Sequence, residues 1–157
     1  MPDITTTTPA GGTVGPAVAN QVAFFTAATA VGGDAGFTYD SVNNAFTIGT
    51  ARAHSTGTAN TFFGQAAGNF TLTGTENSGY GSNSLNAITT GIQNSAYGAA
   101  SLELATTGGS NAAFGFQALS SITTVSSCSA FGFNALLVNT AASISAFGAR
   151  ALDANTT

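Results

Sequence analysis

Charge is the scarcest property of this chain. Only 5% of its 157 residues are charged, lysine is absent, and Arg52 and Arg150 are the only arginines. A typical globular domain carries about 25% charged residues, so solubility here must come from Thr, Ser, Asn and Gln. Because the net charge is −4 and no basic patch exists, we expect neither nucleic-acid binding nor polybasic attraction to a membrane surface.

Side chains that perform chemistry are also few. The chain has one histidine, His54, and one cysteine, Cys128, so an intrachain disulfide is excluded and a catalytic base has one candidate. The six acidic residues are scattered along the chain, whereas polysaccharide hydrolysis requires two carboxylates placed close together. We therefore predict no enzyme activity, cofactor site or metal site, and interpret His54 as a solvated linker residue.

Long apolar runs are missing as well. No segment approaches the ~18 apolar residues of a membrane span. Met1-Pro2-Asp3-Ile4 has neither the basic nor the apolar region of a secretory signal. We expect synthesis in a cytoplasm without an export signal, as for a protein that is released when its host cell lyses.

A repeat takes the place of these missing features. Six aromatic–glycine pairs recur, with steps of 17, 17, 17, 17 and 16 residues between their glycines. The aromatic members are Phe63, Tyr80, Tyr97, Phe114, Phe131 and Phe147. A fixed period of this size indicates a small unit that buries its core only against its neighbours. The sequence therefore predicts an all-β fold, an elongated β-solenoid or β-roll-like shaft of about 17-residue repeats.

Two further positions keep the same register. Four residues before each glycine stand Asn60, Asn77, Asn94 and Asn111, then Cys128 and Ile144. Four residues after it stand Leu85, Leu102, Leu119, Leu136 and Leu152, with Gly68 in the first repeat. We predict that the aromatic residues and leucines form the core and that the asparagines hydrogen bond from coil to coil. Cys128 is interpreted as a drifted ladder position. The glycine-to-leucine segment forms either a helical turn or extended chain.

Each repeat offers a thin core. One aromatic residue and one leucine per layer leave a single chain with an exposed apolar face, and such faces mark association surfaces. Three copies sharing each layer would cover that face. We therefore expect a homotrimer.

The rest of the chain divides by composition. Residues 1–17 are rich in Thr, Gly and Pro and predict an extended arm. Residues 18–50 predict a small β module, with a hairpin over 36–49 around a turn of Asn residues. Residues 51–59 are expected to be a linker, and 60–157 the repeat shaft, which ends without a cap.

Two elements together resemble phage tail-fibre proteins and related virion fibres. Gly36-Phe37-Thr38-Tyr39-Asp40, with Asn44 to Gly49, is similar to the G-L-T-Y-D leader ahead of their shafts. Asn94 to Gly98, with Ser101-Leu102 and Thr106-Thr107-Gly108, resembles their N-T-A-x-G-x-x-A-L…T-T-G repeats and, more distantly, the coils of trimeric autotransporter heads.

The resemblance implies a trimeric tail fibre located in the virion. Its N-terminal arm would bind another virion protein of the tail or capsid, and its repeats would form a projecting shaft. A capsid decoration or cement protein is the first alternative. A glycan-binding adhesin module is the second. No membrane-anchor or receptor-binding domain is recognised, so binding of a host glycan would fall to regions outside this sequence.

Overall fold

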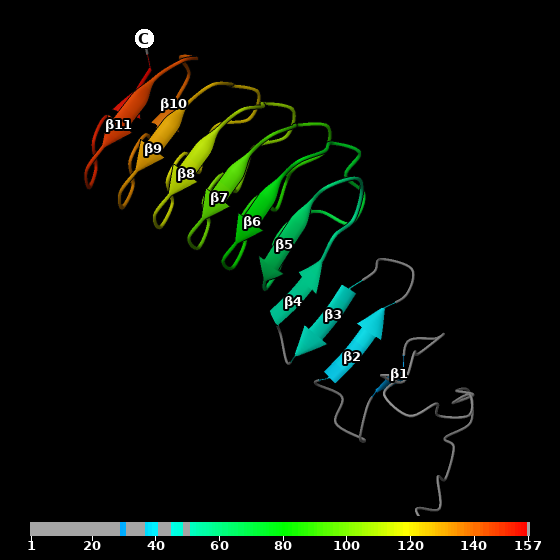
Figure 1. Cartoon of the computed structure of the whole chain (residues 1–157). Helices are drawn as coiled ribbons and strands as arrows, with labels where there is room; N and C mark the ends of the chain where they lie inside the picture. The colour runs from blue at the N-terminus through cyan, green and yellow to red at the C-terminus, as the bar shows by residue number, and fades with distance from the viewer. Residues whose placement is uncertain (1–28, 31–36, 41–44, 49–50, 157) are drawn as a thin grey trace, which may run out of the picture.

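The computed structural model describes residues 29–30, 37–40, 45–48 and 51–156, and this part of the chain contains strands and turns but no helix. Stacked coils of about 17 residues form a β-solenoid, as the repeat predicted (Figure 1). The strands are β1 Thr29–Ala30, β2 Phe37–Asp40, β3 Ala45–Ile48, β4 Ala51–His54, β5 Thr61–Gly64, β6 Ser78–Tyr80, β7 Ser95–Tyr97, β8 Ala112–Phe114, β9 Ser129–Phe131, β10 Val138–Asn139, β11 Ser145–Phe147 and β12 Ala154–Asn155.

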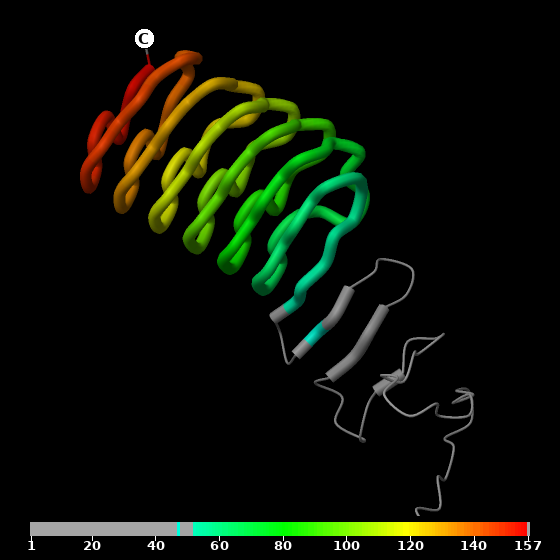
Figure 2. The backbone as a smooth tube through the Cα atoms, in the orientation of Figure 1, coloured from blue at the N-terminus to red at the C-terminus, as the bar shows by residue number. Residues whose placement is uncertain are grey.

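One ten-stranded sheet runs through the molecule in the order β1-β2-β3-β4-β5-β6-β7-β8-β9-β11. Neighbours from β1 to β5 are antiparallel, and neighbours from β5 onward are parallel. Each parallel pair is in register, with aromatic opposite aromatic, as for Tyr97 and Phe114. In the backbone trace, coils of the same shape follow one another along the shaft (Figure 2). We call the part of each coil that leads from the turn back to the next strand of the large sheet the returning side. There, in the last coils, β10 and β12 form a second, two-stranded parallel sheet.

The glycine-to-leucine segment is a tight turn, neither helix nor strand. The N–H of Ser101 donates to the carbonyl of Gly98 at 3.3 Å, and Ala100 between them has φ 55°. A positive φ at the third residue of such a turn is the mark of type II geometry. Leu102 also has a positive φ of 50°, which costs a non-glycine residue about 1–2 kcal/mol. Burial of the leucine contributes about 1.5–3 kcal/mol and outweighs that cost.

Glycine begins this turn because the coils touch there. Gly98 has φ +135°, and a Cβ added to it would lie 2.5 Å from the carbonyl oxygen of Gly115 in the next coil. Real Cβ atoms do not approach backbone so closely. The glycine therefore supplies an unusual φ and, wherever another coil follows, room for that coil.

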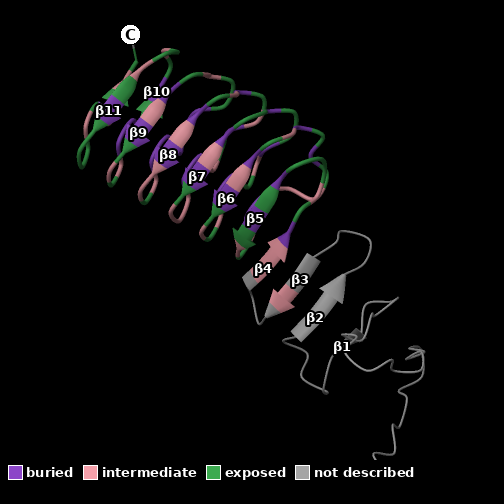
Figure 3. Cartoon of the chain, viewed as in Figure 1, coloured by how far each residue is buried: buried purple, intermediate pink, exposed green. Residues whose placement is uncertain are grey.

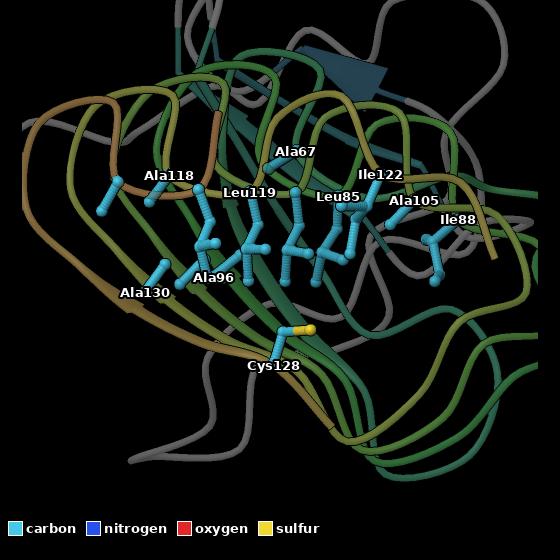
Figure 4. Close-up of a cluster of buried hydrophobic side chains, with 14 of the residues drawn as sticks. Ala67, Leu85, Ile88, Ala96, Ala105, Ala118, Leu119, Ile122, Cys128 and Ala130 are labelled. Carbon is cyan, nitrogen blue, oxygen red and sulfur yellow. The ribbon is translucent and has the colours of Figure 1, made fainter. Parts of the chain in front are cut away.

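The leucines fill the interior as predicted, with one exception. Leu85, Leu102, Leu119 and Leu136 are fully buried, whereas Leu152, in the last coil of the described chain, is exposed. Figure 4 shows Leu85 and Leu119 pointing into the coil interior beside Ile88 and Ile122. The opposite wall is a column of mostly small residues, two before each glycine, for which the sequence pattern predicted no place in the core. We call it the inner column: Phe62, Gly79, Ala96, Ala113, Ala130 and Ala146.

The interior of the first coil is filled by a different side chain from that of the other coils. Gly68 stands where the later coils have leucine, and Phe62 stands where they have alanine or glycine. A Cβ added to Gly68 would overlap the Phe62 ring, and one added to Gly79 would lie 2.9 Å from it. The phenyl ring thus occupies the space of the missing leucine, and the two glycines make room for it.

The segments before the shaft differ partly from expectation. β2 and β3 pair as an antiparallel hairpin from Phe37↔Ile48 to Asp40↔Ala45, the region where a hairpin was predicted. The predicted linker 51–59 is wrong in its first part, because β4 pairs with both β3 and β5 and continues the sheet into the shaft. The predicted arm 1–17 and the hairpin turn 41–44 lie outside the described residues.

Candidate functional site

Alternation along each strand decides which columns face outward. In β7, Ala96 is fully buried, Ser95 on one side of it is partly exposed, and Tyr97 on the other side is exposed. Successive side chains of a strand point to opposite faces, so the residues flanking the inner column lie on the outside of the parallel sheet. Figure 3 shows a buried residue between more exposed ends in β5 to β9 and in β11.

The aromatic residues are therefore not part of the interior of the chain, and the prediction that they form its core is wrong. Phe63, Tyr80, Tyr97, Phe131 and Phe147 are exposed by 54%, 38%, 39%, 36% and 70%, and Phe114 is half-buried. The interior holds leucine, isoleucine and alanine side chains in their place. We call these six aromatic residues the aromatic column.

Five rings of the aromatic column, from Tyr80 to Phe147, stack on one another along the shaft. Tyr80, Tyr97, Phe114, Phe131 and Phe147 are separated by 4.9, 4.8, 4.7 and 5.0 Å between successive ring centroids, with interplanar angles of 4–8°. Parallel strands about 4.8 Å apart impose this spacing. Each ring face inside the column is covered by a neighbouring ring, and the ring edges remain open to the outside.

Small and polar residues lie beside the rings. The column three residues before each glycine contains Thr61, Ser78, Ser95, Ala112, Ser129 and Ser145, and we call it the outer small column. Together with the aromatic column it forms what we call the outer face. Phe116 and Phe133, which directly follow Gly115 and Gly132, stack with their ring centroids 5.5 Å apart and border this face. No charged residue belongs to the outer face.

The asparagine ladder is present as predicted, and it is internal. The Nδ2 of Asn94 donates to Asn77 Oδ1 at 3.0 Å and to the carbonyl of Gly108 at 2.9 Å. Its Oδ1 accepts from the backbone N–H of Asn111 at 3.1 Å and from Asn111 Nδ2 at 3.0 Å. The amide thus uses both donors and both lone pairs, which a buried polar group requires.

The ladder runs from Asn60 to Asn111, and all four of its asparagines are buried. In the fifth coil its place is taken by Cys128, whose backbone N–H donates to Asn111 Oδ1 at 3.0 Å. The buried thiol faces the carbonyl of Ala141 at 3.4 Å and receives a contact from Asn139 Nδ2 at 3.3 Å. Cys128 therefore stands in the ladder position, as the repeat register predicted.

His54 closes the N-terminal end of the solenoid interior. Its Nε2 lies 2.6 Å from the carbonyl of Ala67, and its ring packs against Phe62 at 4.9 Å and Phe70 at 4.4 Å. The interpretation of a solvated histidine is wrong, because the side chain is buried under the first coil. Burial and, to a lesser degree, the charge of Arg52 lower the pKa of His54 from its usual value of 6.5, although the Ala67 carbonyl opposes this shift. The guanidinium of Arg52 lies 4.5 Å from the Phe70 ring centroid.

The acidic side chains of the shaft engage separate partners. Glu76 accepts a hydrogen bond from Gln93, Glu103 accepts one from Asn83, and Asp153 forms an ion pair with Arg150 at 3.1 Å. Within the described part of the chain, no three His, Cys, Asp or Glu side chains gather in a way that could hold a metal ion. No helix long and apolar enough to cross a membrane is found among the described residues.

Comparison of the chain with protein-family models, curated proteins and solved structures finds no match. A functional proposal for this chain therefore depends on the geometry of the shaft itself.

Proposed function

We propose that this chain is a structural protein of a bacteriophage virion, a homotrimeric tail fibre whose repeats form a projecting shaft. The observation that carries the proposal is the combination of an internal ladder of asparagines with an uncharged, aromatic outer face that no part of the described chain covers. The first feature makes the shaft a continuous hydrogen-bonded stack. The second leaves a surface suited to further protein–protein contact.

The proposed role is mechanical and not enzymatic. The acidic residues of the shaft are engaged in separate surface contacts, and His54 is buried against the first coil. Neither arrangement supplies the paired acid and base of a hydrolase. In this proposal the N-terminal arm, residues 1–17, binds another virion protein and holds the shaft in place.

The exposure of the aromatic rings is an argument for the glycan-binding alternative. A sugar stacks on the flat face of an aromatic ring, and exposed aromatic residues would supply such faces. Within the aromatic column, however, each interior ring face is covered at 4.7–5.0 Å by the next ring. This favours contact through ring edges and therefore supports association over glycan stacking.

Purified virions test the proposal. An antibody raised against the full chain should label the tail in immunogold electron micrographs, and quantitative gel densitometry should give a few trimers per particle. Label over the shell with hundreds of copies would favour the capsid decoration alternative. Absence of the chain from virions would refute both. Binding of the isolated protein to a glycan array would favour the adhesin module.

A further inference from the structure

The outer face has properties that limit what can bind there. It presents a line of ring edges, flanked by Ser, Thr and Ala, over the whole length of the parallel sheet. It has no charged side chain on which a charged ligand or a charged partner surface would be selected. Both faces of the Tyr97, Phe114 and Phe131 rings are occupied by neighbouring rings, so the middle of the column offers a flat ligand no free ring face.

We propose that the outer face is the surface through which copies of this chain associate, side by side and parallel, with equivalent coils at the same level. The inference rests on the trimeric fibre proposed above and names its contact surface and register. The surface consists of the aromatic column and the outer small column, with Phe116 and Phe133 at its border.

A second copy matches this face in spacing. The rings recur at 4.7–5.0 Å because the coils do, and any partner that meets them along several coils needs the same spacing. Another copy of the shaft has it by construction. The chain carries a net charge of −4, so copies would repel through a charged surface. The outer face is the strip where they can approach without that penalty.

The area of the outer face sets the size of the contact. From the outer small column to the residue after each glycine, about five positions at ~3.3 Å on coils about 4.8 Å apart give a flat area of ~480 Å² per copy. This is below the ~800 Å² that each partner contributes to a standard interface, whether two copies or three meet, so area does not choose between them. The number three is that of the fibre proposed above.

The distribution of tyrosine fixes the direction. Tyr80 and Tyr97 lie in the second and third coils, and Phe114 and Phe131 in the fourth and fifth. In a parallel arrangement tyrosine hydroxyls meet one another or bridging water, and phenyl rings meet phenyl rings. In an antiparallel arrangement each hydroxyl would lie against a phenyl ring of the partner without a hydrogen-bonding group, which is unfavourable for a buried tyrosine.

Oligomeric mass of the full chain tests the surface. The double variant Tyr97→Ser with Phe114→Ser removes two central rings, and we expect at least a tenfold loss in association by analytical ultracentrifugation. The matched control is Leu104→Ser with Val138→Ser, which removes comparable exposed apolar side chains on the returning side of the coils. We expect the control to keep the parental mass. Equal dissociation of both variants, or a monomeric parent, would overturn the proposal.

A second variant avoids loss of the ring stack. Ser95→Glu with Ser129→Glu keeps every ring and adds two carboxylates per copy to the outer small column. Circular dichroism should match the parent, whereas association should fall and recover in part at high salt, because salt screens the added repulsion. Unchanged association with both carboxylates present would contradict the proposed surface.

Chemical cross-linking tests the register. In a Cys128→Ser background, Ser145→Cys should give covalent dimers with a short bismaleimide, because equivalent residues of parallel copies lie at the same level, whereas an antiparallel copy would bring its first coil to this position. Ser121→Cys, exposed on the returning side, is the control for the surface and should remain monomeric on denaturing gels. Absence of cross-linked Ser145→Cys would contradict the parallel register, and equal cross-linking of the control would contradict the surface.

The two proposals fail separately. If virions contain the chain but the ring variants associate normally, the proposed function stands and the proposed surface is refuted. A shaft that trimerises through the outer face but is absent from virions would do the reverse.

Discussion

A buried asparagine in the middle of the ladder joins three coils through one side chain. Asn94 receives two hydrogen bonds from Asn111 in the coil after it and donates one to Asn77 in the coil before it. A hydrogen bond of this kind contributes about 1 kcal/mol, but a buried donor or acceptor left without a partner costs about 1–3 kcal/mol. Replacing one of these asparagines should therefore cost more stability than the net contribution of its hydrogen bonds suggests.

Replacing Asn94 by alanine should lower the free energy of unfolding by ~3 kcal/mol or more, because the N–H of Asn111 and the carbonyl of Gly108 lose their side-chain partner. Urea unfolding followed by circular dichroism measures the change. Gln93→Ser is the control. Gln93 is exposed, and Ser110 and Ser127 occupy its position in later coils, so a change within about 0.5 kcal/mol is expected. Comparable losses in the two variants would mean that the buried ladder has no special weight.

His54 should make stability depend on pH below neutrality. Burial lowers its pKa in the folded chain, so the unfolded chain takes up a proton at a higher pH than the folded chain does. The unfolded state then binds more protons in the window below 6.5, and stability falls as pH falls through it. Well above 6.5 both states are neutral and the full stability is present.

The measurement compares the parent with His54→Phe, which keeps the packing against Phe62 and Phe70. Thermal unfolding between pH 5 and pH 8 should show a steeper loss on acidification for the parent than for the variant. Parallel pH profiles would show that this imidazole titrates alike in the folded and unfolded chains.

At the scale of one coil, the glycine that starts the turn is where neighbouring coils come closest. Gly98 and Gly148 both have positive φ, of +135° and +121°. A Cβ on Gly98 would meet the backbone of Gly115, whereas a Cβ on Gly148 has nothing within 4 Å. Both positions require a positive φ, but only at Gly98 would a side chain also clash with the next coil.

Gly98→Ala should therefore destabilise the shaft by about 1–3 kcal/mol more than Gly148→Ala, because forced overlap adds to the cost of the strained φ. Denaturant unfolding of the two variants gives the difference directly. If both cost the same, contact between coils contributes nothing to the glycine requirement.

The sequence predicted the elements of the coil better than their orientation. The period, the asparagine ladder and the leucines were read from residues that recur in one register. For the aromatic column, recurrence and hydrophobicity together suggest burial, but neither indicates on which side of the strand a residue lies. The strand period held the answer: Asn94 and Ala96 are two apart and share the inner face, so Tyr97 must face outward.

Other features of the site could not be read from local pattern. His54 is buried by Phe62, Ala67 and Phe70, all of which come from the following coil. A lone histidine in a polar stretch gives no sign of this. The positive φ of Leu102 was also hidden, because leucine does not favour that conformation and adopts it here only for burial.

For the whole molecule, stability should behave as a sum over coils. Each coil packs and hydrogen bonds only with its neighbours, which is the condition for nearly additive, nearest-neighbour energetics. Removing one complete repeat should then preserve every column, whereas removing part of a repeat should disrupt all of them.

Deletion of residues 95–111 joins Asn94 to Ala112-Ala113-Phe114 and restores the repeat register. We expect a folded, cooperatively melting shaft that is slightly less stable than the parent. Deletion of residues 95–103 is the control, since it places each later column out of phase with the earlier ones. Thermal melts and far-ultraviolet circular dichroism distinguish the two outcomes. A shaft that tolerates both deletions would not be governed by the period.

The direction of the strands also determines how the molecule carries load. The strands lie across the long axis, so the backbone hydrogen bonds between coils point along it. A pull on the two ends would stretch those bonds in line and peel coils away one at a time, a weaker response than shearing many bonds together. Lateral contact between several such rods would spread the tension over all of them, so bundling confers tensile strength that one rod lacks.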